Sequence, residues 1–389
     1  MRTFILRLLF IVPLFAHFDT ICINESLFSE DIKSALDPTN TEEPSQEPRP
    51  YDISFSPQQI ELPWLTGPLL TASAHVIPIS HFDIQPYIFY TTNYGSYSAH
   101  WHESNVPHFY TFTLQIPFWI GLTENLDIRF YPQLSQNHTE GVRNWVFNDL
   151  PFGIDIQLLN DHFPSWWPAI KLQLGAVAPI GKYQRLNPSK KGTDIGGTGS
   201  WNPNMALCFS RYHYFKGHFL ASRMALIYFI PTPVYVHGLN TYGGGNHTHG
   251  KVSPGGIFVA QMGFEYTFTK HIASALDIQY LHIDKTRFRG SSGTTASTTS
   301  TTGSILIPPS DLAPIIIPTR PGQLLPLIPP SQIHPATVGF PSSEQFSLAA
   351  ALEYNFNASL GLIAGGWFSI AGRNSAAFAS AVAAFNYYY

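Results

Sequence analysis

The sequence predicts an all-β protein, a transmembrane antiparallel up-and-down β-barrel of about 12 strands (12–14) with short periplasmic turns and long extracellular loops. Charged residues make up 12% of the chain and aromatic residues 14%, whereas about a quarter of a typical soluble protein is charged. The mean hydropathy is nevertheless close to zero, and after the N-terminus no apolar run reaches the roughly 18 residues of a membrane helix. Period-2 alternation recurs from residue 67 onward.

The alternation is clear within single segments. In residues 150–158, the apolar Phe152, Ile154 and Ile156 share one face while Asp155 and Gln157 share the other. The same scheme recurs in residues 170–176, 258–268 and 346–356. Such strands would turn apolar side chains toward lipid and polar ones toward the lumen, which keeps the mean hydropathy neutral.

The connections between these segments alternate in length. Short turns are expected at 123–125, 269–271 and 357–359, and longer loops near 94–107, 135–146, 184–200, 238–254 and 290–342. Short periplasmic turns and long external loops are typical of outer-membrane barrels. Twelve or thirteen strands can be counted. Because antiparallel closure needs an even number, either residues 69–78 lie outside the wall or a further strand near 53–61 completes it.

Three segments of the chain differ in composition. Residues 1–21 resemble a secretory signal, with Arg2 and Arg7 before a short apolar core. Residues 22–66 are acidic and rich in proline, and are expected to form a flexible periplasmic linker. Residues 67–389 would form the barrel, in which 290–342 is a low-complexity insertion. This insertion is expected either to lie outside the barrel as an irregular loop or to fold into the lumen.

Charged residues within the alternating segments are predicted to point into the lumen, because a charge facing lipid at mid-bilayer costs about 2 to 4 kcal/mol. They are Asp127, Arg129, Asp155, Lys171, Arg223, Glu265, Asp277 and Glu353. Adjacent strands would pair Asp155 with Lys171 and bring Glu265 near Asp277. The second pair would share a proton, bind a cation or be neutralised by an arginine. The whole set would form either a structural polar network or a charge-selective lining.

Several function classes are disfavoured. A net charge of −4 without a basic cluster beyond Lys190-Lys191 argues against a nucleic-acid partner. Cys22 and Cys208 provide neither a disulfide framework nor a thiolate metal site. His247 and His249 are only two ligands, which makes a poor metal site. Since no catalytic arrangement of Ser and His is evident either, we expect no catalytic residues, no metal and no cofactor, and therefore no enzyme.

The chain ends in an aromatic strand. Phe385, Tyr387 and Tyr389 share one face of this segment. Together with the signal and the alternating segments, we interpret them as the signal read by the barrel insertion machinery of the outer membrane. The expected location is the outer membrane of a Gram-negative bacterium, with the lipid bilayer as the principal partner.

Several stretches share motifs with a known family. They include NDLPFGIDIQLL (148–159), PIGKYQRLNPSKKGTDIGGTGS (179–200) and EYTFTKHIASALDIQY (265–280), and with 67–90 and 342–375 they span most of residues 67–389. These stretches resemble the MetA-pathway phenol-degradation family of outer-membrane proteins. The resemblance implies a barrel that passes small molecules, hydrophobic or aromatic compounds among them, and it supplies no catalytic residues.

The functional expectation is an outer-membrane channel or transporter for small-molecule solutes. The alternative is a closed structural or adhesion barrel whose long external loop binds a partner. Discrete conductance across a bilayer distinguishes the two. A soluble β-sandwich is a third reading, and partitioning into detergent distinguishes it from a membrane barrel.

Overall fold

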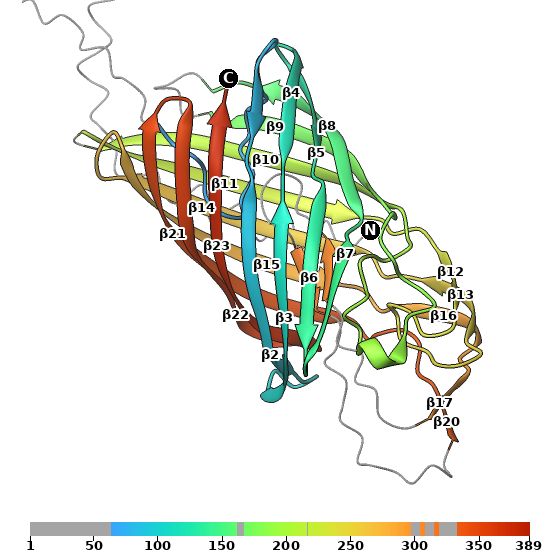
Figure 1. The fold of residues 1–389 in the computed structure, drawn as a ribbon. Coiled ribbons are helices and arrows are strands. Elements are labelled where there is room, and N and C mark those ends of the chain that lie inside the picture. The colour runs from blue at the N-terminus through green and yellow to red at the C-terminus, as the bar shows by residue number, and fades with distance from the viewer. Residues whose placement is uncertain (1–63, 162–166, 216, 297–303, 308–314, 319–332) are drawn as a thin grey trace, which may run out of the picture. The chain divides into compact units, whose positions relative to one another are not determined.

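The computed structural model describes residues 64–389 except for 162–166, 216, 297–303, 308–314 and 319–332 (Figure 1). The predicted signal and nearly all of the predicted linker lie outside the described residues. Among the described residues, no helix is long and apolar enough to span a membrane.

Sixteen β-segments form one antiparallel sheet that closes into a barrel of 12 wall strands, as the sequence predicted. Eight wall strands are continuous: β9 (Ala169–Ala178), β10 (Asn202–Phe215), β11 (His218–Phe229), β14 (Ile257–Thr267), β15 (Ile272–Ile283), β21 (Ser343–Asn357), β22 (Leu360–Arg373) and β23 (Ser375–Tyr388). The other four each comprise two segments: β1 (Phe82–Ile84) with β2 (Tyr87–Tyr97), β3 (Glu103–Gln115) with β4 (Phe118–Thr123), β5 (Leu126–Phe130) with β6 (Gln133–Thr139), and β7 (Val142–Phe147) with β8 (Leu150–Leu159). The barrel closes because β23 pairs with β22 on one side and with β1 and β2 on the other.

Prolines explain the interruptions. Because proline has no N–H to donate, it breaks a strand ladder. The carbonyls of Pro117, Pro132 and Pro151 accept from the N–H groups of Gln85, Ile116 and Tyr131 on neighbouring strands, at 3.0–3.1 Å. The breaks are therefore aligned in a line across the sheet. Beyond this line, β7 pairs with β6 alone, whereas β8 pairs with both β5 and β9.

Two of the expected long loops are strands instead. Residues 94–107 belong mainly to β2 and β3, and residues 135–146 form the β6–β7 hairpin around Glu140 and Gly141, both of which have positive φ. These segments are polar because side chains such as Ser135 and Asn137 point inward and are buried. The prediction of loops, which relied on polarity, was therefore wrong for both segments. A further external connection, at Asn374 between β22 and β23, is a tight turn.

The outer face of the barrel is apolar. Exposed apolar side chains occur on most wall strands, including Ile88, Tyr90, Trp145, Phe147, Ile154, Met205, Leu276, Ile278, Leu352, Phe368 and Phe385. A soluble monomer rarely exposes so continuous an apolar surface. This surface is the lipid-facing band of a transmembrane barrel.

A small external sheet extends the wall on the extracellular side. It consists of β12 (Val234–His237), β13 (His249–Ser253) and β16 (Arg287–Ser291) in that order. Beside it lies a short 3-10 helix (Pro188–Lys190). The predicted insertion contains two short antiparallel ladders, β17 (Thr294–Ala296) with β20 (Ile333–Pro335) and β18 (Ser304–Ile307) with β19 (Ile315–Pro318).

Candidate functional site

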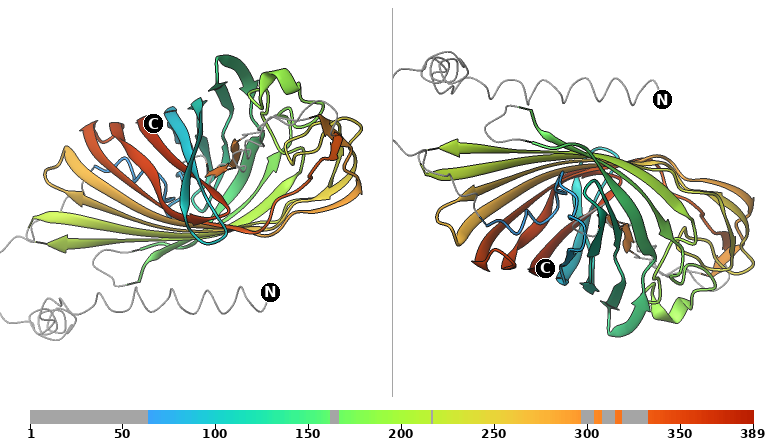
Figure 2. Two further views of the ribbon diagram at one scale, coloured as in Figure 1. Left: turned by 90° about the horizontal axis from the view of Figure 1, so that it is seen from below. Right: turned by 90° about the horizontal axis from the view of Figure 1, so that it is seen from above.

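An N-terminal strap, residues 64–78, lies inside the barrel and not in its wall. Leu69, Leu70, Ala72 and Ala74 are at most 1% exposed. The strap lies among the wall strands in both views of Figure 2. Of the two possibilities left open for residues 69–78, the structure thus shows the one outside the wall. Thr66, within the expected linker, is buried in the barrel as well.

The strap enters beside the periplasmic turns. The Trp64 carbonyl accepts from Asn355 Nδ2 at 3.0 Å. The Trp64 ring packs edge-on against His271 at 5.0 Å, and the Lys270 ammonium lies 4.7 Å from its centre. Because residues 269–271 form the β14–β15 turn, the entry point is fixed to the periplasmic rim.

Wall carboxylates accept the backbone N–H groups of the strap. Glu353 accepts from Thr66 N at 3.0 Å, and Asp127 accepts from Ile77 N at 2.8 Å. Asp277 accepts from the N–H groups of Leu70 and Thr71 and, at 2.7 Å, from the Thr71 hydroxyl. A buried segment without a strand partner must satisfy its backbone donors in some other way. Inward carboxylates supply the acceptors that a neighbouring strand supplies elsewhere.

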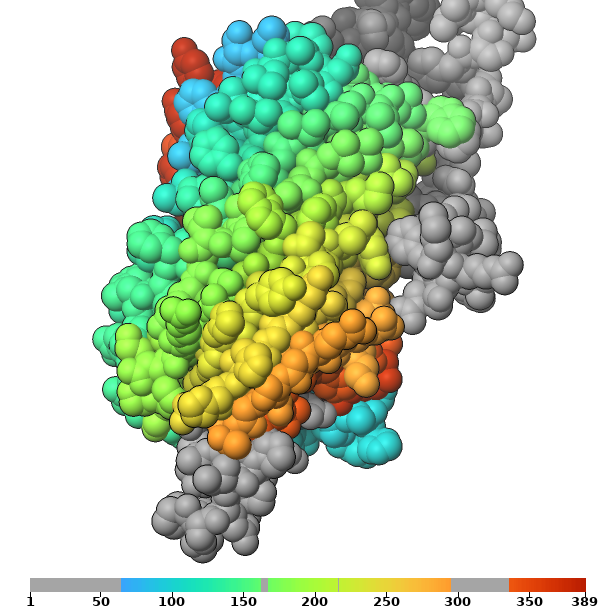
Figure 3. All heavy atoms as spheres, turned by 90° about the vertical axis from the view of Figure 1, so that its right-hand side faces the viewer, coloured from blue at the N-terminus to red at the C-terminus, as the bar shows by residue number. Residues whose placement is uncertain are grey.

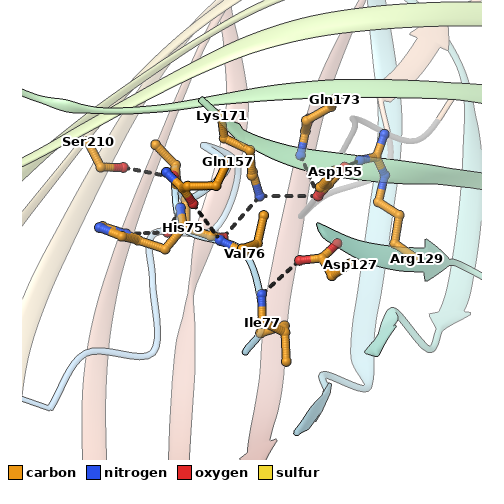
Figure 4. Close-up of polar contacts among 12 residues, drawn as sticks. His75, Val76, Ile77, Asp127, Arg129, Asp155, Gln157, Lys171, Gln173 and Ser210 are labelled. Atoms are coloured by element: carbon orange, nitrogen blue, oxygen red, sulfur yellow. Dashed lines mark hydrogen bonds and ion pairs between the residues drawn. The ribbon is translucent and has the colours of Figure 1, made fainter. Parts of the chain in front are cut away.

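Neutral and basic side chains complete these contacts (Figure 4). Ala74 N donates to Ser210 Oγ at 2.9 Å, and Val76 N donates to Gln157 Oε1 at 3.0 Å. The amide nitrogen of Gln157 donates back to the Ala74 carbonyl at 2.8 Å. Lys171 Nζ lies 3.3 Å from the His75 carbonyl. Along its length the strap is therefore bonded to β21, β15, β10, β9, β8 and β5, and this order follows the order of the strands around the wall.

The remaining predicted charges pair with one another. Asp155 forms ion pairs with Arg129 and, at 3.2 Å, with Lys171, and it also accepts from Gln173. The expected proximity of Asp155 and Lys171 is thus present in the structure.

Glu265 and Asp277, the expected pair of like charges, have separate partners. Asp277 lies opposite Gly263 in the register and bonds to the strap. Arg223 forms an ion pair with Glu265 at 2.7 Å. Of the three possibilities for this pair, the geometry matches neutralisation by an arginine from another strand.

All eight predicted inward charges are buried. None is more than 7% exposed, so they do not form an open, hydrated surface in this state. Each bonds either to the strap or to another member of the set. This arrangement is a structural polar network that holds a chain segment, and whether any member also selects solutes stays a prediction.

Three wall glycines make room for the strap. A Cβ built on Gly263 would lie 2.9 Å from Pro68 and Thr71, and one on Gly121 would overlap the Pro78 backbone at 1.9 Å. A Cβ on Gly361 would lie 2.2 Å from the Thr66 hydroxyl. The wall sequence is therefore adapted to the strap, which argues that the strap occupies this position in the folded protein.

An inward loop, residues 192–200, occupies the lumen from the extracellular side. Asn137, on the inner face of β6, donates to the carbonyls of Thr193 and Ile195, both at 3.2 Å. Asp149 accepts from Gly181 N at 2.9 Å and from Thr198 N at 2.7 Å. The loop therefore covers the inner face of β6 beside the edge strand β7.

Two features of the sequence fit the position of this loop, and both become apparent from the contacts in the structure. A Cβ on Gly196 would meet the Phe147 carbonyl oxygen at 2.2 Å, and one on Gly197 would meet Asp149 at 2.1 Å. The run Gly-Gly-Thr-Gly and the isolated Asp149 thus belong to one site. Burial raises the pKa of the Tyr242 phenol, which stays protonated and donates to the Thr198 carbonyl at 2.9 Å.

The C-terminal aromatic residues lie on the outer face. Phe385, Tyr387 and Tyr389 are each more than one third exposed. The backbone of Tyr389 exchanges two hydrogen bonds of 2.9 Å with Phe82 where β23 meets β1. Their role as an insertion signal stays a prediction.

No family model and no curated protein matches the chain. An outer membrane channel from Pseudomonas putida F1 is similar over 82% of this chain and 98% of its own length, with 11% identity and a TM-score of 0.53. The transport unit of the autotransporter AIDA-I from Escherichia coli covers 79% of this chain and 90% of its own, with 8% identity and a TM-score of 0.40. The TodX monoaromatic hydrocarbon channel (deltaS2S3 mutant) is similar over 79% of this chain and 89% of its own length, with 11% identity and a TM-score of 0.32.

Of these three structures, only the channel from Pseudomonas putida F1 is similar enough to bear on the fold. With the closed 12-strand wall and the outward apolar band, this similarity identifies the chain as an outer-membrane β-barrel of the Gram-negative type.

Proposed function

We propose that this barrel is an outer-membrane channel for small molecules and that the N-terminal strap narrows its lumen. The observation that carries the proposal is the strap itself. It takes no part in the wall, yet Thr66, Thr71 and Ile77 are bonded to wall carboxylates inside the closed barrel. A segment held in this way limits the cross-section through which a solute passes.

We further propose that the solutes include hydrophobic or aromatic compounds. The support is the motif resemblance to the MetA-pathway phenol-degradation family. Passage would be driven by the solute gradient alone. The proposal needs no covalent chemistry, cofactor or nucleic acid.

The alternative is a closed barrel with a structural or adhesive role. It is favoured by one observation, that the strap and the inward loop enter the barrel from opposite ends while the inward charges stay buried. In this alternative, the insertion at 290–342 would contact a partner outside the cell.

Conductance in a planar bilayer tests the proposal. We would compare the wild type with a variant lacking residues 64–78, and use a variant lacking residues 40–54 of the predicted linker, a deletion of the same length, as a control for shortening of the chain before the wall. The wild type is expected to give small discrete steps, the strap deletion larger ones and the control steps of wild-type size. Silence in all three, with heat-modifiable gel mobility showing folded barrels, would contradict the channel and favour the closed barrel.

A further inference from the structure

The external sheet continues the lipid-facing wall strand by strand. Residues 230–233 join β11 to β12, residues 254–256 join β13 to β14, and residues 284–286 join β15 to β16. The order β12–β13–β16 therefore repeats the wall order β11–β14–β15. Figure 3 shows these yellow and orange segments side by side on the molecular surface, next to the wall strands from which they extend.

The two faces of this sheet differ. One face is apolar, and Val234, Val236 and Val252 are buried there with Phe288 packed against them. The opposite face is exposed and carries Tyr235, His237, His249, Lys251, Arg287 and Arg289. We call this exposed set the cationic sheet face.

The cationic sheet face lacks counter-charges. The three strands contain no acidic residue, and Lys251 lies directly opposite Arg289 in the register. Like charges placed in this way destabilise a sheet. None of the ion pairs among the described residues includes Lys251, Arg287 or Arg289.

Two carboxylates beside the connection from β15 to β16 already have partners. Asp284 lies 3.2 Å from His282, and Glu344 lies 3.1 Å from Arg373. The Lys251 ammonium lies over the Tyr235 ring at 5.9 Å from its centre. The cationic sheet face is therefore suited to an anion from outside the chain.

We propose that the cationic sheet face binds the phosphate groups of the phosphorylated glycolipid in the outer leaflet. The position supports this partner, because the outer face changes from the exposed apolar Leu276 and Ile278 of β15 to Arg287 and Arg289 of β16 along the same run of chain. Lipid phosphates lie just beyond the apolar band of a membrane barrel. Arginine forms forked, charge-assisted hydrogen bonds with phosphate oxygens.

Lipid binding to the purified full-length protein tests this inference, with native mass spectrometry as the readout. The probes are bis-phosphorylated lipid A, the same lipid without phosphates, and inorganic phosphate. R287Q/R289Q removes two charges from the sheet, and K190Q/K191Q removes two charges from the neighbouring loop as a matched control. We expect the wild type and the control to prefer the phosphorylated lipid, and R287Q/R289Q to lose about tenfold in its affinity, with a further loss on adding K251Q.

Each other outcome overturns the inference. Equal binding of the phosphorylated and phosphate-free lipids would show that the phosphates are not recognised. An equal loss in both double variants would indicate an effect of overall charge. Displacement of the lipid by millimolar inorganic phosphate would point to a site for the free ion. Unchanged heat-modifiable mobility verifies that each variant is folded, and the outcome does not depend on whether the barrel conducts.

Discussion

The inner surface of the barrel has a charged half and a neutral half. On β5, β8, β9, β11, β14, β15 and β21 it carries the eight charged residues that bond to the strap or to one another. On β2, β3, β6 and β23 it carries hydroxyl and amide groups in neighbouring pairs, such as Thr91 with Ser380 and Thr113 with Ser135. Hydroxyl pairs suffice where neighbouring strands already satisfy the backbone. Charges occur where a segment without strand partners needs fixed acceptors.

The largest effect is expected from Asp277→Ala in the charged half. The change leaves three donors of Leu70 and Thr71 without an acceptor, and each buried unsatisfied donor costs about 1 to 3 kcal/mol. We expect the strap to detach or the protein to lose about 3 kcal/mol of unfolding free energy. Hydrogen exchange of residues 64–78 and unfolding in urea with lipid vesicles measure the two effects. Unchanged exchange would show that Asp277 does not hold the strap.

A smaller effect is expected from Asp149→Ala, which removes the anchor of the inward loop. Gly181 and Thr198 lose their acceptor, at a cost of about 2 kcal/mol. Faster hydrogen exchange should be confined to residues 192–200 and spare the strap. If the inward loop and the strap both exchanged faster in this variant, the two segments would not be held independently of each other.

Gly263→Ala tests the fit of the strap without changing any charge. The added Cβ would lie 2.9 Å from Pro68 and Thr71, and overpacking of this kind costs about 1.5 kcal/mol. Gly366→Ala is the matched control, since the nearest heavy atom to its Cβ would be 3.9 Å away. Protease accessibility of the strap should rise in the first variant only, and an equal rise in both would contradict the account.

The smallest effect is expected in the neutral half. Thr113→Ala removes one hydroxyl pair with Ser135 and should lower the unfolding free energy by about 1 kcal/mol. Single-channel conductance should stay near the wild-type value because the strap is untouched. An effect on stability as large as that of Asp277→Ala would remove the distinction between the two halves.

Period-2 alternation predicts an antiparallel barrel of about 12 strands (12–14), and the wall has 12. The eight charges within the alternating segments are buried in the structure. The alternation could not place the strap, because residues 64–78 bond to side chains such as Asp277 and Gln157 and to no strand ladder. A loop is predicted at 135–146 because the segment is polar, but Ser135 and Asn137 are inward side chains of the β6–β7 hairpin. The inward loop requires contact between Asp149 and Thr198, which are 49 residues apart, and no local pattern reports such a contact.

The most direct test of the central claim is single-channel conductance of the wild type beside Asp277→Ala/Glu353→Ala, which removes two anchors of the strap while its residues stay in the chain. If the strap narrows the lumen, the double variant should give discrete steps larger than those of the wild type under the same salt and voltage. Steps of equal size, with hydrogen exchange showing that the strap has been released, would contradict the claim.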